Sequence, residues 1–101
     1  MPNADSHGWV AEMVEQTRAL DSSRLIEDNS PCHYDHVVTD INSWHAYLPG
    51  YRWRERLDEF SAKTFPGSTW NFIGGRKQGR QPNFNSECGN VWGYEGSTGD
   101  V

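Results

Sequence analysis

The order of the periodic segments is the feature that most constrains the fold of this chain. Apolar residues recur at helical spacing over residues 9–20 and 52–62, and short runs with strand character cover residues 24–28, 36–41 and 82–87. Helices that alternate with short strands are typical of βαβ units, whose strands run parallel. Three strands cannot close a barrel or cover both faces of a sheet. We therefore expect an α/β chain that forms part of a larger structure.

Both predicted helices are amphipathic. The apolar side of the first helix consists of Trp9, Val10, Met13, Val14, Thr17 and Leu20. The second helix carries Trp53, Leu57 and Phe60 on one stripe. A helix with an apolar stripe is stabilised by burying that stripe against another element, so each helix is expected to have a partner surface.

Composition limits what the chain can bury and what it can bind. Its 101 residues include five Trp, four Tyr and four Phe, while 35% of the residues are hydrophobic. The aromatic surplus serves either a compact core or a binding surface. The net charge of −5 is spread along the chain. This distribution argues against nucleic acid as a partner, because proteins that bind nucleic acid cluster their Lys and Arg residues.

The sequence shows no recognisable targeting segment. No apolar stretch approaches the roughly 20 residues of a membrane-spanning helix, so no membrane partner is expected. The residues after Met1 lack the basic start and the apolar segment of a secretory signal peptide. Cys32 and Cys88 fit free thiols as well as one disulfide bridge. These features leave the cellular compartment unassigned.

Polar residues gather where the predicted strands end. Residues 27–29 close the first strand, residues 40–47 include the end of the second, and residues 85–87 close the third. In α/β barrels the catalytic groups stand at the C-terminal ends of the strands. Asn, Asp and Ser also favour turns for reasons of backbone geometry, so one such position carries little weight. Three strand ends of the same character favour a functional site.

The segment 85–89, with the sequence Asn-Ser-Glu-Cys-Gly, carries the most specific signal. It resembles the strand-end motif of glycoside hydrolase family 2, in which Ser-Glu followed by a small or aromatic residue and Gly carries the nucleophile. Residues 18–30 are similar to the family's fifth strand with the end of the preceding helix. Residues 40–47 are similar to its sixth strand, residues 52–60 to the next helix and residues 82–89 to its seventh strand. The resemblance implies that residues 1–101 are a partial catalytic domain, covering about strands 5 to 7 of a (β/α)8 TIM barrel.

The resemblance also implies a retaining glycosidase with Glu87 as its nucleophile and no cofactor. Its substrate would be a β-linked carbohydrate such as a galactoside, mannoside or glucuronide. Retaining enzymes use two carboxyl groups about 5–5.5 Å apart. The family's acid/base is a Glu that follows an Asn, and no Asn-Glu pair occurs in this chain. We therefore expect the chain to require the remainder of the barrel and to be inactive alone.

Six residues are the candidates for binding the sugar. They are Asp28, Asn42, Trp44, His45, Tyr47 and Trp92. Family members often place a Tyr near the nucleophile at the end of the sixth strand, and Trp44, His45 or Tyr47 takes that place here. Trp44 fits a sugar-stacking surface or a core, and Trp92 fits a sugar cleft or a loop anchor.

Two functions of other classes compete with the glycosidase. A non-catalytic carbohydrate-binding module would explain the aromatic residues, but it predicts mostly antiparallel strands and no long helices. A metal-dependent enzyme could use Cys32, His33 and His36. Their spacing matches no standard zinc pattern, so a loop with unrelated histidines is the favoured interpretation and no metal ligand is assigned.

Overall fold

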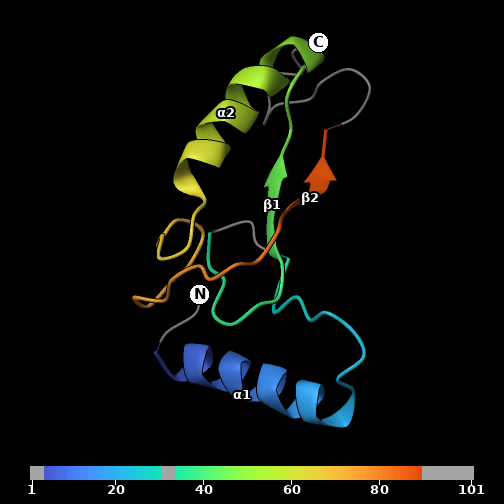
Figure 1. Cartoon of the computed structure of the whole chain (residues 1–101), viewed down its shortest axis with the longest axis vertical. Coiled ribbons are helices and arrows are strands. Elements are labelled where there is room, and N and C mark those ends of the chain that lie inside the picture. The colour runs from blue at the N-terminus through green and yellow to red at the C-terminus, as the bar shows by residue number, and fades with distance from the viewer. Residues whose placement is uncertain (1–3, 31–33, 90–101) are drawn as a thin grey trace.

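The computed structural model describes residues 4–30 and 34–89. Within these ranges the chain forms helix α1 (Ala4–Leu20), strand β1 (Asn42–Ala46), the short 3-10 helix η1 (Gly50–Arg52), helix α2 (Trp53–Lys63) and strand β2 (Asn83–Cys88). Strands β1 and β2 are parallel, and α2 lies between them in the sequence. The second half of the chain is therefore a βαβ unit, as the alternation of segments predicts (Figure 1).

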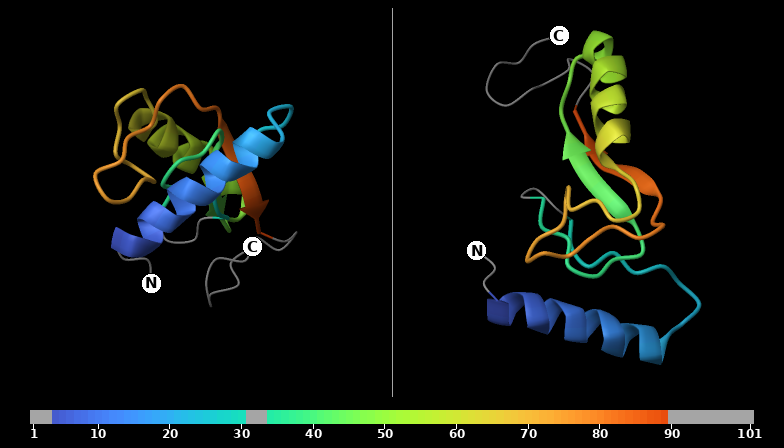
Figure 2. Two further views of the ribbon diagram at one scale, coloured as in Figure 1. Left: turned by 90° about the horizontal axis from the view of Figure 1, so that it is seen from below. Right: turned by 60° about the vertical axis from the view of Figure 1, so that its left-hand side comes forward.

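The two helices lie at opposite ends of the molecule. Helix α2 runs alongside the two strands, whereas α1 crosses the far end of the structure (Figures 1 and 2). Both strand arrows point away from α1. The carboxyl ends of β1 and β2, which carry His45 and Glu87, therefore lie at the end of the molecule opposite α1.

An aromatic core holds α2 against the sheet. Trp44, Ala46, Leu48 and Phe60 form a buried cluster, and Trp53 and Trp70 pack against it. The Trp44 and Phe60 rings meet edge to face, with centroids 4.6 Å apart and planes at 85°. Edge-to-face contacts suit the opposite partial charges of a ring's face and edge. Part of the aromatic surplus of the sequence thus serves the core rather than a binding surface.

Helix α1 is attached less tightly. Val14 is buried, but Trp9 is 61% exposed and Leu20 is 89% exposed, so the expected apolar side is only partly covered. A hollow of about 140 Å³ remains between α1 and the segment 26–28. An ion pair of 2.9 Å between Arg18 and Asp40 ties the last turns of α1 to the chain before β1. No helix among the described residues is long and apolar enough to cross a bilayer.

The predictions of the first two strands were wrong. Residues 24–28 form no strand, and residues 36–41 contribute only an isolated bridge between His36 and Phe72. Regular strand structure begins later, at Asn42, where the backbone amide donates to the Pro82 carbonyl at 2.9 Å. The strand prediction for residues 82–87 agrees with β2 to within one residue at each end.

Aspartate side chains explain why residues 36–41 are not a strand. The Asp28 carboxylate accepts the Val37 and Val38 amides at 2.5 and 3.1 Å, so these donors are unavailable to a ladder. Asp40 accepts the Ile26 amide at 2.9 Å, while its own amide donates to the Ile26 carbonyl at 2.8 Å. Short polar side chains compete with secondary structure for backbone groups in this way. The β-branched residues of this segment therefore lie in irregular chain.

Candidate functional site

A β-bulge sets the direction of Glu87. Ser43 pairs with Phe84 and Trp44 with Asn85, but His45 pairs with Glu87 because the register shifts by one residue after Trp44. Alternate residues of a strand point to opposite faces, so regular pairing would have put Ser86 beside His45. The inserted residue puts Glu87 there instead. Bulges often re-aim a side chain next to an active site.

The Asn85 side chain spans this bulge. Its amide nitrogen donates to the Trp44 carbonyl and to the Glu87 carbonyl, both at 3.1 Å. A bulge locally disrupts the ladder and takes backbone groups out of regular pairing. Asn85 supplies a donor to carbonyls on both strands at this point and so stabilises the shifted register. Sequence reasoning placed Asn85 in the nucleophile motif but did not find this role.

Glu87 lies within reach of His45 and, through it, of Ser30. The His45 Nδ1 and Glu87 Oε2 atoms are 4.0 Å apart, and the Glu87 side chain is 56% exposed. On the other side of the ring, His45 Nε2 lies 2.9 Å from the Ser30 hydroxyl. The Tyr47 ring meets the His45 ring edge-on, with centroids 6.5 Å apart. The strand end thus groups a carboxylate, an imidazole and a hydroxyl beside an aromatic ring.

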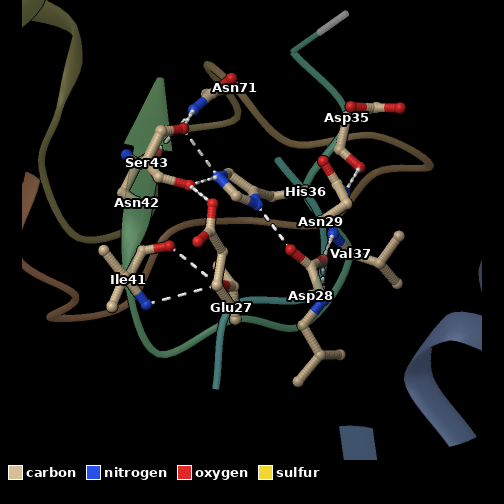
Figure 3. A network of polar contacts seen from close by, with 12 residues as sticks. Glu27, Asp28, Asn29, Asp35, His36, Val37, Ile41, Asn42, Ser43 and Asn71 are labelled. Carbon is tan, nitrogen blue, oxygen red and sulfur yellow. Dashed lines mark hydrogen bonds and ion pairs between the residues drawn. The ribbon is translucent and has the colours of Figure 1, made fainter. Parts of the chain in front are cut away.

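A second polar cluster lies buried, on the amino-terminal side of β1 (Figure 3). His36 is fully buried, and its Nδ1 atom lies 2.6 Å from Asp28 Oδ1 while its Nε2 atom lies 2.8 Å from the Ser43 carbonyl. A carboxylate and a carbonyl both accept hydrogen bonds, so both ring nitrogens must donate. Only the imidazolium has two N–H groups. The geometry therefore favours a buried ion pair between His36 and Asp28.

The electrostatics of His36 agree with that assignment. Burial by itself lowers the pKa of the imidazole. The hydrogen bond to Asp28, the bond to the Ser43 carbonyl and the charges of Asp28 and Glu27 act in the opposite direction and outweigh it. The pKa of His36 is therefore raised above its ordinary value of 6.5. Because its charge is buried and paired with Asp28, we interpret His36 as a structural residue and not as a catalytic one.

Buried amides and the exposed residue Glu27 extend this cluster. Asn71 donates to Asn42 Oδ1 at 2.7 Å and to the Ser43 carbonyl at 2.8 Å, and Asn42 donates to Gln78 at 3.1 Å. The Ser43 hydroxyl donates to Glu27 at 2.5 Å. These bonds tie the start of β1 to the loop before β2. By anchoring the start of β1, they fix the position of His45 along the strand.

The structure corrects three of the predicted sugar-binding residues. Asn42 is fully buried and bonded to other amides, so it does not face a ligand. Trp44 is 4% exposed and packs in the core against α2, because its position on β1 alternates with that of His45. The Asp28 side chain is fully buried against His36. In this structure all three side chains lie in the interior and contact other residues of the chain.

The remaining predicted site residues divide into two groups. His45 and Tyr47 lie at the carboxyl end of β1, where His45 pairs with Glu87 and the Tyr47 ring meets the His45 ring. Trp92 lies outside the described residues, as do Cys32 and His33. Within residues 4–30 and 34–89, no group of three His, Cys, Asp or Glu side chains is arranged to hold a metal ion. Both nitrogens of His36 already have partners, so His36 is not available as a ligand.

Sequence reasoning missed Ser30 and Asn71. No motif marks Ser30, because it reaches His45 from a loop 15 residues earlier in the chain. Asn71 has a positive φ of 67°, a conformation that Asn tolerates better than most residues. An Asn next to the aromatic residues 70 and 72 was a faint signal of a turn with a buried side chain.

Comparisons with known proteins identify no relative. No protein-family model, no curated protein and no solved structure matches the chain.

Proposed function

We propose that this chain supplies the nucleophile of a retaining β-glycosidase, as part of a larger α/β barrel. The observation that carries the proposal is the bulge, which turns Glu87 toward His45 at the carboxyl edge of two parallel strands joined by a helix. Catalytic groups of α/β barrels stand at this edge. The half-exposed Glu87 carboxylate is open to a ligand, whereas the Asp28 carboxylate is not.

The proposed reaction follows the two-step course of retaining glycosidases. A Glu87 oxygen attacks the anomeric carbon of a β-linked sugar while an acid/base carboxyl group protonates the leaving oxygen. A covalent glycosyl ester forms on Glu87 and the first alcohol leaves. Water then attacks the same carbon, gives its proton to the acid/base and releases the sugar with its configuration retained. The remainder of the barrel would provide the acid/base.

Two observations weigh against the competing functions. A carbohydrate-binding module was expected to show antiparallel strands and no long helices, whereas β1 and β2 are parallel and α1 spans 17 residues. A metal site built on His36 conflicts with the buried ion pair that occupies this ring. Neither observation applies to the glycosidase proposal.

Covalent trapping of the intermediate tests the proposal directly. The full-length enzyme is treated with activated 2-fluoro glycosides of the galacto, manno and glucurono series, digested and sequenced by mass spectrometry. The sugar is expected on the peptide with residues 85–87, and Glu87→Gln is expected to remove both label and turnover. Glu59→Gln, on the exposed side of α2, is the matched control. Label on Asp28, Asp40 or Glu95, with an active Glu87→Gln enzyme, contradicts the proposal.

The 101-residue chain by itself provides a second test. Hydrolysis of nitrophenyl β-glycosides by the purified chain is expected to stay at the buffer rate, because the chain has no Asn-Glu pair to serve as the acid/base and turnover needs that group to activate water in the second step. Addition of the remainder of the barrel as a separate polypeptide is expected to raise the rate, because it would supply the group that acts as acid in the first step and as base in the second. Turnover by the chain alone would mean that its acid/base lies among its own residues.

A further inference from the structure

The ring of His45 is held between two partners of different chemistry. Its Nε2 atom lies 2.9 Å from the Ser30 hydroxyl, and its Nδ1 atom lies 4.0 Å from Glu87 Oε2. The His45 side chain is 12% exposed, whereas that of Glu87 is 56% exposed. The imidazole is thus enclosed and oriented, and the carboxylate in front of it faces open space.

The hydrogen-bonding capacity of these groups sets the tautomer. The Glu87 carboxylate is an acceptor only, so the nitrogen that faces it is favourably placed when it carries the proton. With the proton on Nδ1, a neutral ring leaves Nε2 as an acceptor, and the Ser30 hydroxyl is able to donate to it. The bond on one side of an imidazole decides which nitrogen donates on the other side. The Ser30 hydroxyl therefore donates to His45 Nε2, and the His45 Nδ1–H group points its proton toward Glu87.

We propose that Ser30 and His45 are positioning residues for Glu87, with the Nδ1–H group of His45 steering the carboxylate that attacks the sugar. This inference rests on the proposed function of Glu87. The 4.0 Å separation is longer than a hydrogen bond. Catalytic hydrogen bonds are often long in a free enzyme and shorten when the substrate binds. Contraction of this gap aims one Glu87 oxygen at the anomeric carbon.

The bulge and the buried cluster make this arrangement specific. His45 is beside Glu87 only because the register of the two strands shifts at this point. Ser43, two residues before His45 on the same strand, anchors the position of His45. The Ser43 carbonyl accepts hydrogen bonds from His36 and Asn71. A placement error of 1 Å in a reacting group can cost about 100-fold in rate. A rigid support below His45 is what a positioning role requires.

Two replacements of His45 separate its two nitrogens. In His45→Asn the side-chain amide is attached where Nδ1 is attached and can still donate toward Glu87. In His45→Gln the amide extends to the position of Nε2, toward Ser30. The rate at which the activated 2-fluoro glycoside labels Glu87 in the full-length enzyme is expected to fall about 100-fold in His45→Gln. In His45→Asn it is expected to fall at most about 10-fold, with KM little changed in both. Equal losses, or a more active Gln variant, contradict the proposal.

The contribution of Ser30 is tested by a double-mutant cycle. Ser30→Ala is expected to slow the labelling of Glu87 about 10-fold in the parent enzyme, because the orientation of the ring is lost. It is expected to add nothing in the His45→Gln background, since Ser30 acts through His45 and coupled residues are not additive. Ser61→Ala, on the exposed side of α2, is the matched serine control. Additive losses overturn the direction from Ser30 to His45 to Glu87.

The 101-residue chain allows a spectroscopic check that needs no activity. The ¹⁵N shifts of the His45 ring, measured by long-range NMR correlation, are expected to show the proton on Nδ1. Ser30→Ala is expected to move the ring toward a mixture of tautomers, and Ser61→Ala is not. A ring protonated on Nε2 in the parent chain contradicts the proposal.

The outcomes distinguish this inference from the proposed function. If the glycoside labels a residue other than Glu87, the nucleophile is wrong and the proposed function fails with it. If it labels Glu87 at the same rate in the parent and in both His45 variants, only the positioning role fails. Serine, imidazole and carboxylate in this order also occur in hydrolases with a serine nucleophile. Labelling of Ser30 by a fluorophosphonate would assign that role to Ser30 and overturn the positioning proposal.

Discussion

One histidine–carboxylate pair lies next to the start of strand β1 and another lies at its carboxyl end, and the two pairs differ in burial and in the distance between the partners. His36 and Asp28 are 2.6 Å apart, and both side chains are fully buried. His45 and Glu87 are 4.0 Å apart, and the Glu87 side chain is 56% exposed. The first pair also has its remaining ring nitrogen and its second carboxylate oxygen bonded to the backbone. The second pair leaves its carboxylate open.

The difference shows how burial separates structural groups from functional ones. A buried ion pair repays the loss of hydration only when every polar atom has a partner, and such a pair has no capacity left for a ligand. A carboxylate at an open strand end has given up little hydration and can still form a bond to an incoming group.

Asp28→Asn is expected to have the largest effect on stability. His36, Val37 and Val38 all donate to the Asp28 carboxylate, and in Asn one of the two acceptor oxygens is replaced by an NH2 group that donates. The buried charge on His36 also loses its partner. Removal of one member of a buried pair costs about 3–5 kcal/mol. Urea denaturation of the parent, Asp28→Asn and the exposed control Asp58→Asn measures the loss. A loss below about 1 kcal/mol would show that the buried pair contributes no more to stability than the exposed pair.

The pH dependence of stability is expected to be set by the buried pair. The pKa of His36 is raised above 6.5, so the folded state binds this proton more tightly than the unfolded state. The stabilisation is complete below pH 6.5 and is lost as the pH rises through the higher pKa of the folded protein. The free energy of unfolding therefore falls by at most about 1.4 kcal/mol per pH unit in that window.

The acid side of the profile follows from another carboxylate. The hydrogen bond from Arg18 outweighs partial burial and lowers the pKa of Asp40 below 3.8, so its contribution is lost as the pH falls below that value. Unfolding free energies between pH 3 and pH 9 are expected to show the maximum between about pH 4 and pH 6.5. His45→Asn is expected to keep the alkaline loss. A profile that becomes flat in this variant would assign the loss to the exposed pair.

Asn85→Ala is expected to have an intermediate effect. The variant loses two hydrogen bonds that span the bulge, each worth about 1 kcal/mol or less because the side chain is half-exposed. Asn83→Ala, in the same strand, loses a bond to Thr64 away from the bulge and is the matched control. Asn85→Ala is expected to lose about 1–2 kcal/mol, and Asn83→Ala, which loses one exposed bond, at most about 1 kcal/mol. Only Asn85→Ala is expected to slow the labelling of Glu87. Equal labelling rates in the two variants would show that the bulge does not position Glu87.

Glu87→Gln is expected to have the smallest effect on stability. The Glu87 side chain is half-exposed and lies 4.0 Å from His45, so the free energy of unfolding is expected to change by less than about 0.5 kcal/mol. The same denaturation series measures it beside Asp28→Asn. A loss comparable to that of Asp28→Asn would show that Glu87 is a structural residue and that the contrast between the pairs is wrong.

The helices and the last strand could be predicted because their signals are local. The apolar spacing of residues 9–20 and 52–62 agrees with the positions of α1 and α2, since helical periodicity is a local signal. It did not show which apolar residues are buried, because Trp9, Leu20 and Leu57 stay exposed. The β-branched run at 36–41 misled the prediction, because the Asp28 carboxylate takes the amides that a ladder would use. Strand β1 formed instead over residues with little intrinsic preference for strands, through its pairing with β2.

The candidate site divides in the same way. The sequence by itself placed Glu87 at the carboxyl end of the last strand, because the signal for that strand is local. The other two predicted strand ends were wrong, since residues 24–28 form no strand and residues 42–46, which were expected to follow a strand, are β1 itself. Only the tertiary structure decided that Asp28 and Asn42 are buried, that Trp44 faces the core, and that a bulge puts Glu87 beside His45. Burial and register depend on contacts between residues far apart in the chain, and one inserted residue reverses the face to which a side chain points. No local pattern encodes that choice.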